Sequence, residues 1–243
     1  METIKLKING IEVTAPKGST ILEAARLAHI EIPTLCFLKE INEIGACRIC
    51  IVELKNGKLV TSCVYPAEDG MEVFTNTPKV MDSRKKTIQL LLSNHNRSCL
   101  SCVRSGHCEL QELAHELGVE DETYYDGEMT PSEIDTTAAH MIRDNSKCIL
   151  CRRCVAVCEN VQGIGVIGAN NRGFSTSIGS AFEMGLGETS CVSCGQCIAV
   201  CPTGALTEKD YTGDVFAAIA DPKKHVIVQT APAVRAGLGE EFG

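Results

Sequence analysis

The chain has 243 residues, a formal net charge of -8 and 15 cysteines, but only 6 Phe, 4 Tyr and no Trp. This length suffices for one or two domains of about 100 to 200 residues. Because the aromatic side chains that usually dominate cores are scarce, the composition predicts a fold built around inorganic centres. The negative charge gives no support to a nucleic-acid-binding surface.

The beginning of the chain does not read as a targeting signal. Its first residues carry an acid and lysines where a signal peptide has a basic start and an apolar run, and no stretch of about 18 apolar residues occurs. We therefore expect a cytoplasmic protein without a membrane span. In a reducing cytosol, dense cysteines indicate metal binding rather than a disulfide scaffold, and the odd cysteine count argues against complete pairing.

Two β-hairpins and a helix are predicted in the first part of the chain. Apolar residues alternate with polar ones over residues 4–8 and 11–13, on either side of an Asn-Gly turn, and a second hairpin is predicted over residues 51–60. Between them, Thr20 and Glu23 have the spacing of a capping box, and an apolar stripe follows. These elements predict a small sheet wrapped over one helix.

From Pro78 onward the apolar spacing changes to that of helices. Apolar side chains recur on one helical face within residues 88–92 and on another within 110–117, and Gly118 is placed to end the second helix. Residues 116–135 then hold eight acids and no Lys or Arg. We interpret this stretch as a solvated connector, with a docking surface as the alternative.

The last two groups of cysteines share one spacing. Each reads C-x2-C-x2-C-x3-C, the two runs align at an offset of 43 residues, and the second continues into Pro202. This pattern is typical of bacterial ferredoxins with 4Fe-4S clusters, whereas zinc sites usually use separated C-x2-C pairs.

The fourth cysteine of each run is predicted to bind the cluster of the other run. Three closely spaced cysteines wrap one cluster, while the fourth projects from the following helical turn towards its neighbour. We predict one cluster on Cys148, Cys151, Cys154 and Cys201, and the other on Cys191, Cys194, Cys197 and Cys158.

The first group of cysteines lies across the predicted strands and turns. Its spacing, C-x10-C-x2-C-x12-C, departs from the plant-type C-x4-C-x2-C, so the spacing alone leaves structural zinc open. Four thiolates can hold one 2Fe-2S cluster, and the runs further along the chain favour iron here as well. The predicted ligands are Cys36, Cys47, Cys50 and Cys63.

The remaining group, Cys99, Cys102 and Cys108, lacks a fourth ligand. Two histidines lie nearby. His107 adjoins Cys108, so their side chains would tend to diverge, whereas His95 lies four residues before Cys99. We therefore predict that His95 completes this cluster. Replacing a thiolate with a neutral imidazole reduces the negative charge at a cluster, which tends to raise its reduction potential.

Two further patterns are interpreted as structural. Residues 163–168 fit G-x-G-x-x-G, but they follow a cluster-binding turn instead of opening a βαβ unit, so no dinucleotide site is expected. Arg48, Arg152 and Arg153 lie between predicted ligands. We interpret them as solvated side chains, with tuning of cluster potentials as the alternative.

Together these features predict an α+β protein with one 2Fe-2S and three 4Fe-4S clusters. Residues 1–77 are expected to form a β-grasp, 2Fe-2S ferredoxin-like domain. Residues 78–140 are expected to form a small helical 4Fe-4S domain with one-histidine, three-cysteine ligation and the acidic connector. Residues 141–209 are expected to form a bacterial-type 2×(4Fe-4S) ferredoxin domain.

In this order, the motifs resemble the amino-terminal electron-transfer region of iron-only (FeFe) hydrogenases over essentially the whole chain. Residues 226–243 are similar to the opening of the hydrogenase catalytic domain, where a strand leads into Pro232 and a helix, so residues 210–243 are assigned to the start of that domain. The resemblance implies an oxidoreductase that relays electrons to a hydrogen-activating H-cluster. All 15 cysteines are already assigned, so we expect no catalytic residue here and a longer subunit.

The 2Fe-2S domain and the His95 cluster resemble those of multi-subunit hydrogenases that use NAD(P)(H), often with ferredoxin. That resemblance implies a flavin- and NAD(P)-binding iron–sulfur subunit and a small 2Fe-2S subunit as partners, with soluble ferredoxin as a further one. The same beginning is similar to NAD-linked formate dehydrogenase and to the large subunit of NADH:quinone oxidoreductase. A stand-alone polyferredoxin-like carrier, and the question of electron bifurcation, also stay open.

Overall fold

The computed structural model describes residues 2–121, 123–125 and 127–242. The chain divides into two compact units, Met1–Glu208 and Lys209–Gly243, and each is described by itself. Across the described ranges, no helix combines the length and the apolar character that crossing a membrane requires.

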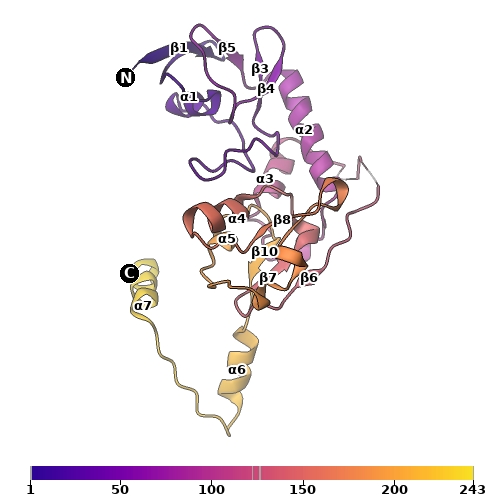
Figure 1. The fold of residues 1–243 in the computed structure, drawn as a ribbon, viewed down its shortest axis with the longest axis vertical. Helices are drawn as coiled ribbons and strands as arrows, with labels where there is room; N and C mark the ends of the chain where they lie inside the picture. Colours follow the sequence, from indigo (N-terminus) through magenta and orange to yellow (C-terminus); the bar gives the residue numbers. More distant parts are fainter. Residues whose placement is uncertain (1, 122, 126, 243) are drawn as a thin grey trace. The chain divides into compact units, whose positions relative to one another are not determined.

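A five-stranded sheet opens the first unit (Figure 1). Its spatial order is β2-β1-β5-β3-β4, and β1 pairs with β5 in parallel while the other pairs are antiparallel. The two predicted hairpins are confirmed. In the first, Ile8 pairs with Ile11, and the turn residues between them, Asn9 and Gly10, both have positive φ. The strands are β1 (Thr3–Ile8), β2 (Ile11–Pro16), β3 (Ile51–Leu54), β4 (Leu59–Thr61) and β5 (Glu72–Phe74).

Helix α1 (Ile21–Leu27) contributes its apolar face to the core of this sheet. The predicted capping box forms, because Thr20 Oγ1 accepts from the Glu23 backbone N–H and the Glu23 carboxylate accepts from the Thr20 backbone N–H. Alternation along β1 buries every second side chain. Ile11 departs from the expected pattern and is 54% exposed, since it directly follows the turn.

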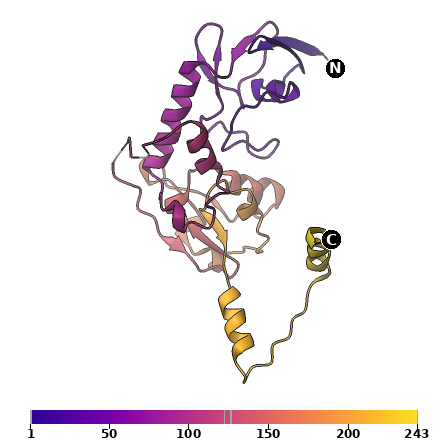
Figure 2. The ribbon, with the colours of Figure 1, turned by 180° about the vertical axis from the view of Figure 1, so that it is seen from behind.

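A second core joins the helical segment to the first cysteine group and to the first of the two cysteine runs. Helix α2 (Pro78–Ser93) begins at the Thr77 cap, and α3 (Glu109–Glu116) follows a short 3-10 turn, η1 (Cys99–Ser101). Figure 2 shows α2 running from the five-stranded sheet. The predicted helical faces are confirmed. Their side chains Ile88, Leu92, Leu110 and Leu113 share a core with Cys36 and Cys47 of the first cysteine group and with Cys151 of the first cysteine run.

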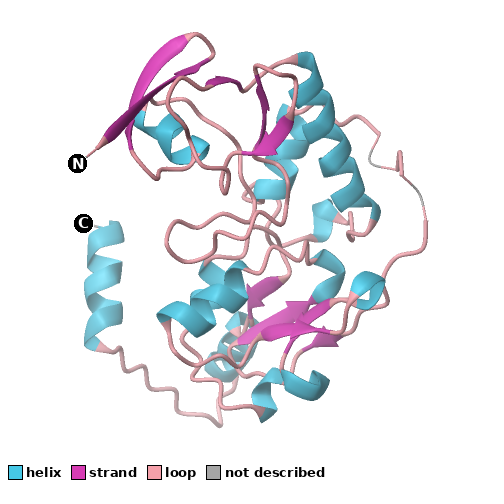
Figure 3. Cartoon of the chain, turned by 45° about the horizontal axis from the view of Figure 1, so that its top comes forward, coloured by secondary structure: helices cyan, strands magenta, loops and turns pink. Residues whose placement is uncertain are grey.

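The third core belongs to the segment with the two cysteine runs, which is built from short strands and helical turns (Figure 3). A three-stranded sheet has the order β10-β7-β6, and β8 pairs with β9. The strands are β6 (Ile134–Asp135), β7 (Met141–Asp144), β8 (Gly168–Asn170), β9 (Ser177–Gly179) and β10 (Leu206–Glu208). The helical turns are η2 (Asn145–Lys147), α4 (Arg153–Ala156), the π-helix η3 (Val157–Val161), η4 (Gly173–Ser175), η5 (Ala181–Glu183), η6 (Leu186–Glu188) and α5 (Gln196–Ala199).

The second unit contains α6 (Thr212–Ala220) and α7 (Pro232–Phe242). The expected helix after Pro232 is confirmed. The expected strand before it is wrong, because residues 222–223 form a turn and residues 224–231 belong to no strand. A strand needs a neighbour for its backbone N–H and C=O groups, and residues 209–242 offer this segment none.

Candidate iron–sulfur sites

The first cysteine set is buried beside the five-stranded sheet. The Cys47 backbone N–H donates to Cys36 Sγ at 3.5 Å, and Cys50 Sγ lies 3.2 Å from Cys63 Sγ. Hydrogen bonding between the thiols of each pair lowers the pKa values of Cys47 and Cys50 and raises those of Cys36 and Cys63. Four sulfur atoms gathered away from solvent, two of them easily ionised, fit the donor set of a metal–sulfur centre.

The two cysteine runs repeat one backbone conformation. The residues on either side of the second cysteine adopt left-handed φ in both: Leu150 (55°) and Arg152 (60°) in the first run, and Ser193 (57°) and Gly195 (73°) in the second. Since non-glycine residues seldom adopt this conformation, its repetition at matched positions marks two loops that wrap their cysteines in the same way.

One small cavity is lined by Cys148, Cys151, Cys154 and Cys201. Burial raises the pKa of Cys148 to about 11 and that of Cys151 to about 12, and the Cys201 charge adds to both effects. Burial also raises the pKa of Cys154 well above its usual value. A bound metal cation offsets the cost of ionising a buried thiol, because a thiol that coordinates a metal is deprotonated outright.

A second small cavity is lined by Cys158, Cys191, Cys194 and Cys197. Burial raises the pKa of Cys197 to about 11, and the charges of the other three thiols contribute in the same direction. Each cavity therefore gathers three cysteines of one run and the last cysteine of the other. This grouping is the one that crossed ligation requires.

The remaining predicted set is His95, Cys99, Cys102 and Cys108, and its cysteines lie in or beside η1 and at the start of α3. His95 is buried, whereas His107 is exposed. Burial lowers the pKa of His95 to about 4, so its imidazole is neutral at pH 7, as a metal ligand must be. Cys102 packs against Gly204, where an added Cβ would lie 2.6 Å from Cys102 Sγ, and Cys108 Sγ lies 3.7 Å from the Pro202 carbonyl oxygen.

Buried side-chain nitrogens without a hydrogen-bond partner gather around these sets. Arg143 and His140 line the two cavities, and Arg84 and Arg153 interact electrostatically with Cys50 and Cys151. Unpartnered buried donors are uncommon, and cluster sulfur atoms are acceptors that would satisfy them, so these residues fit iron–sulfur clusters. In the described part of the chain, the nitrogens are Arg84 Nε, His95 Nδ1, His140 Nε2, Arg143 Nε and Nη1, and Arg153 Nε.

No three His, Cys, Asp or Glu side chains among residues 2–121, 123–125 and 127–242 are grouped so as to hold a single metal ion. The thiols are all free of disulfides.

Two polar contacts join the sets, one buried and one partly exposed. Asn42, which is 3% exposed, donates from Nδ2 to the Cys36 carbonyl at 2.7 Å and to the Cys151 carbonyl at 3.0 Å. Glu109, the residue after Cys108, accepts two bonds from Arg153 at 2.6 and 2.9 Å. The loop of the Cys148–Cys201 cavity is thus tied to the first cysteine set and to the set that contains Cys108.

Three family models match consecutive segments of the chain. The 2Fe-2S iron–sulfur cluster binding domain matches residues 1–78, and the NADH-ubiquinone oxidoreductase-G iron–sulfur binding region matches residues 84–123. The 4Fe-4S dicluster domain matches residues 147–205. These matches confirm the predicted 2Fe-2S and 4Fe-4S cofactors.

Similar proteins extend this result. The chain is 30% identical to one chain of an NAD+-reducing [NiFe]-hydrogenase crystal structure, with a TM-score of 0.79, and the match covers 85% of this chain and 87% of that one. The chain belongs to this family of hydrogenase iron–sulfur proteins. It is also 47% identical to the NADP-reducing hydrogenase subunit HndD of Solidesulfovibrio fructosivorans and 39% identical to iron hydrogenase 1 of Clostridium pasteurianum.

These two relatives match 100% and 97% of the chain, which spans only 42% and 41% of their own lengths. A third relative, the 75 kDa NADH-ubiquinone oxidoreductase protein of Reclinomonas americana, is 34% identical over 86% of the chain and 30% of its own length. Within the family, the chain is an iron–sulfur electron-transfer region that corresponds to the amino-terminal part of the iron hydrogenase.

Sequence reasoning missed the residues that lie between and beside the sets. Asn42, His140 and Arg143 carry no motif, and Asp135, the last acid of the stretch interpreted as solvated, is instead paired with Arg143 at 3.1 Å. No local pattern marks these residues, since Asp135 lies between Ile134 and Thr136 in a mostly polar stretch.

Proposed function

We propose that the chain relays electrons within an iron-only hydrogenase subunit whose H-cluster domain catalyses reversible H2 oxidation. The carrying observation is that each of two cavities is lined by three cysteines of one run and one of the other. The greater identity and coverage of the hydrogenase relatives favour hydrogenase over NADH:quinone oxidoreductase, formate dehydrogenase or a stand-alone carrier.

We assign the ligands as the sequence predicts. The 2Fe-2S cluster belongs to Cys36, Cys47, Cys50 and Cys63, in a β-grasp domain of residues 1–77. A 4Fe-4S cluster belongs to His95, Cys99, Cys102 and Cys108, in residues 78–140. Two more 4Fe-4S clusters belong to the eight cysteines of residues 141–209, each bound by three cysteines of one run and the last cysteine of the other. Residues 210–243 start the catalytic domain. The buried, neutral imidazole of His95 and the change of compact unit after Glu208 support these assignments.

When bound, iron–sulfur clusters exchange single electrons with their neighbours at potentials that the protein tunes. In this chain, Asn42 holds the Cys36 loop against the Cys151 loop, and Glu109 holds the Cys108 loop against Arg153. The set containing Cys148 therefore adjoins both the 2Fe-2S set and the His95 set. Two input routes converge on this central set, and the set containing Cys158 continues the route.

We further propose a cytoplasmic hetero-oligomer. Its partners would be a flavin- and NAD(P)-binding iron–sulfur subunit and a small 2Fe-2S subunit, with soluble ferredoxin as an additional donor or acceptor. The exposed Cys194, at the set that continues the route, supports an onward transfer to another domain or partner on that side.

Infrared spectroscopy of the intact, anaerobically isolated complex tests the hydrogenase assignment. The carbonyl and cyanide ligands of an H-cluster absorb where protein does not, so their bands are the expected result. A complex with its iron–sulfur clusters loaded and its maturation proteins present, but without those bands, would instead be a formate dehydrogenase or an electron carrier.

A further inference from the structure

Arg143 is a buried cation beside the central set. It lies on β7 between β6 and β10, is 7% exposed, and lines the same cavity as Cys148, Cys151 and Cys154. Its Nη2 pairs with Asp135 at 3.1 Å, whereas its Nε and Nη1 are buried and have no hydrogen-bond partner. One edge of the guanidinium is thus neutralised, and two donor nitrogens remain unused.

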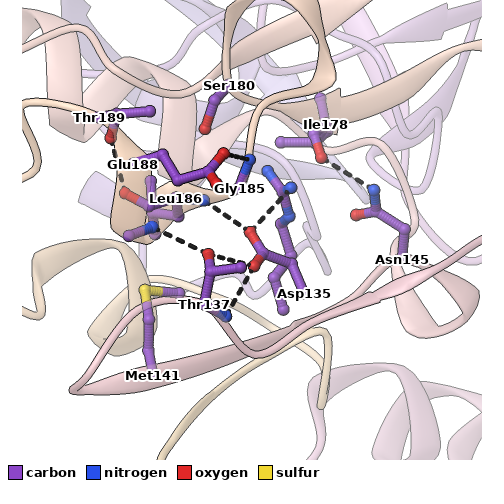
Figure 4. A network of polar contacts seen from close by, with 12 residues as sticks. Asp135, Thr137, Met141, Asn145, Ile178, Ser180, Gly185, Leu186, Glu188 and Thr189 are labelled. Atoms are coloured by element: carbon purple, nitrogen blue, oxygen red, sulfur yellow. Dashed lines mark hydrogen bonds and ion pairs between the residues drawn. The ribbon is translucent and has the colours of Figure 1, made fainter.

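The surrounding structure fixes the guanidinium. Asp135 accepts from the Thr137 backbone N–H at 3.0 Å, from Thr137 Oγ1 at 2.6 Å and from the Leu186 backbone N–H at 2.8 Å, and Figure 4 shows these bonds converging on its carboxylate. At Gly179, an added Cβ would lie 2.9 Å from Arg143 Nη1. A glycine at this position therefore makes room for the guanidinium, and the ion pair holds it there.

We propose that Arg143 sets the reduction potential of the cluster held by Cys148, Cys151, Cys154 and Cys201. Its Nε and Nη1 donate hydrogen bonds to sulfur, and its charge favours the reduced cluster, which carries one more negative charge. This inference rests on the proposed ligand set. It makes the central cluster, where two input routes meet, the preferred acceptor of electrons from both.

Arg152 provides a matched comparison. It lines the same cavity and follows Cys151, but its side chain is exposed, so water screens its charge. A simple count of nearby charges gives both arginines the same effect. Burial and hydrogen bonding instead assign the effect to Arg143.

The experiment is an EPR-monitored redox titration of the anaerobically purified full chain and its variants. For Arg143→Gln we expect the ratio of reduced to oxidised central cluster, at the wild-type midpoint, to fall about tenfold, which equals 59 mV for one electron. Arg143→Lys, which keeps the charge but loses the planar fork, should fall between wild type and Arg143→Gln. Arg152→Gln should change the ratio less than about threefold.

Asp135→Asn supplies a test of opposite sign, which also decides the matter if Arg143→Gln does not fold. Without the neutralising carboxylate, the central cluster should become easier to reduce. An unchanged midpoint in Arg143→Gln, an equal shift of every cluster, or a lower midpoint in Asp135→Asn would overturn the proposal. Iron content and the wild-type cluster spectra report separately on whether the proposed ligand set itself is correct.

Discussion

The two cysteine runs have the same spacing and loop conformation but different surroundings. In the central set, Cys151 and Cys154 are buried and Arg143 and Arg152 line the cavity. In the other set, Cys194 is exposed, and the cavity is lined by His140 and by no arginine among the described residues. The comparison teaches that cysteine spacing selects the cluster, whereas burial and neighbouring donors distinguish the two electron carriers.

Removing the last cysteine of either run breaks this comparison most severely. Cys201→Ala should abolish or convert the cluster of the first run, and Cys158→Ala that of the second, because each cavity borrows its fourth thiol from the other run. Low-temperature EPR of the reduced protein identifies the cluster that is lost. Each variant is the control for the other, and loss of the cluster on the same run as the mutated cysteine would refute crossed ligation.

Replacement of His95 should remove the cluster assigned to His95, Cys99, Cys102 and Cys108 without affecting the other three clusters. His95→Ala takes away the buried, neutral imidazole that we propose as a ligand, whereas His107→Ala alters an exposed histidine nearby and should leave all spectra unchanged. His95→Cys should retain a cluster at a lower potential, since a thiolate adds negative charge. An intact His95 cluster in His95→Ala would transfer the ligand role to another residue.

Loss of the Asn42 bridge should separate the 2Fe-2S set from the central set. Asn42→Leu leaves two buried carbonyls unpaired, at a cost of about 1–3 kcal/mol each in unfolding free energy. Electron transfer from the 2Fe-2S cluster to the central cluster, followed by rapid freeze-quench EPR, should slow.

Asn160→Leu is the control for Asn42. It removes an exposed hydrogen bond of 3.2 Å to the neighbouring Ile41 carbonyl, so it should change stability and transfer little. Equal effects of the two variants would mean that Asn42 has no special part in joining the sets.

The smallest expected effect concerns His140, the counterpart of Arg143 at the second cavity. Its Nε2 is buried without a partner, and an imidazole offers one N–H to sulfur. His140→Phe should lower the reduced-to-oxidised ratio of the second cluster by about threefold, less than the Arg143 effect because fewer donors are lost. His140→Gln, which places an N–H at similar reach, should restore the ratio. Failure of that rescue, with the cluster intact, would assign His140 a packing role.

The parts of the fold that the sequence predicts are those set by neighbouring residues. Alternation along β1, the Thr20 capping box and the helical faces of α2 and α3 all depend on local spacing, and so does the wrapping of three cysteines around one cavity. Resemblance to a known family added the functional assignment.

The parts that escaped prediction depend on distant segments. The β6–β7–β10 sheet places Asp135 beside Arg143, and Asn42 reaches a residue 109 positions away. No local pattern distinguishes these residues from solvated ones, because their roles arise only when separate loops pack. Arg153, interpreted as solvated, is likewise buried and paired with Glu109.

Mössbauer spectroscopy of the anaerobically prepared, iron-57-enriched chain tests the central claim most directly. Four occupied sites predict about 14 iron atoms per chain, with one part of the signal from a 2Fe-2S cluster and about six parts from 4Fe-4S clusters. Zinc in the first set, or a 4Fe-4S signal that accounts for two clusters instead of three, would contradict the proposed relay.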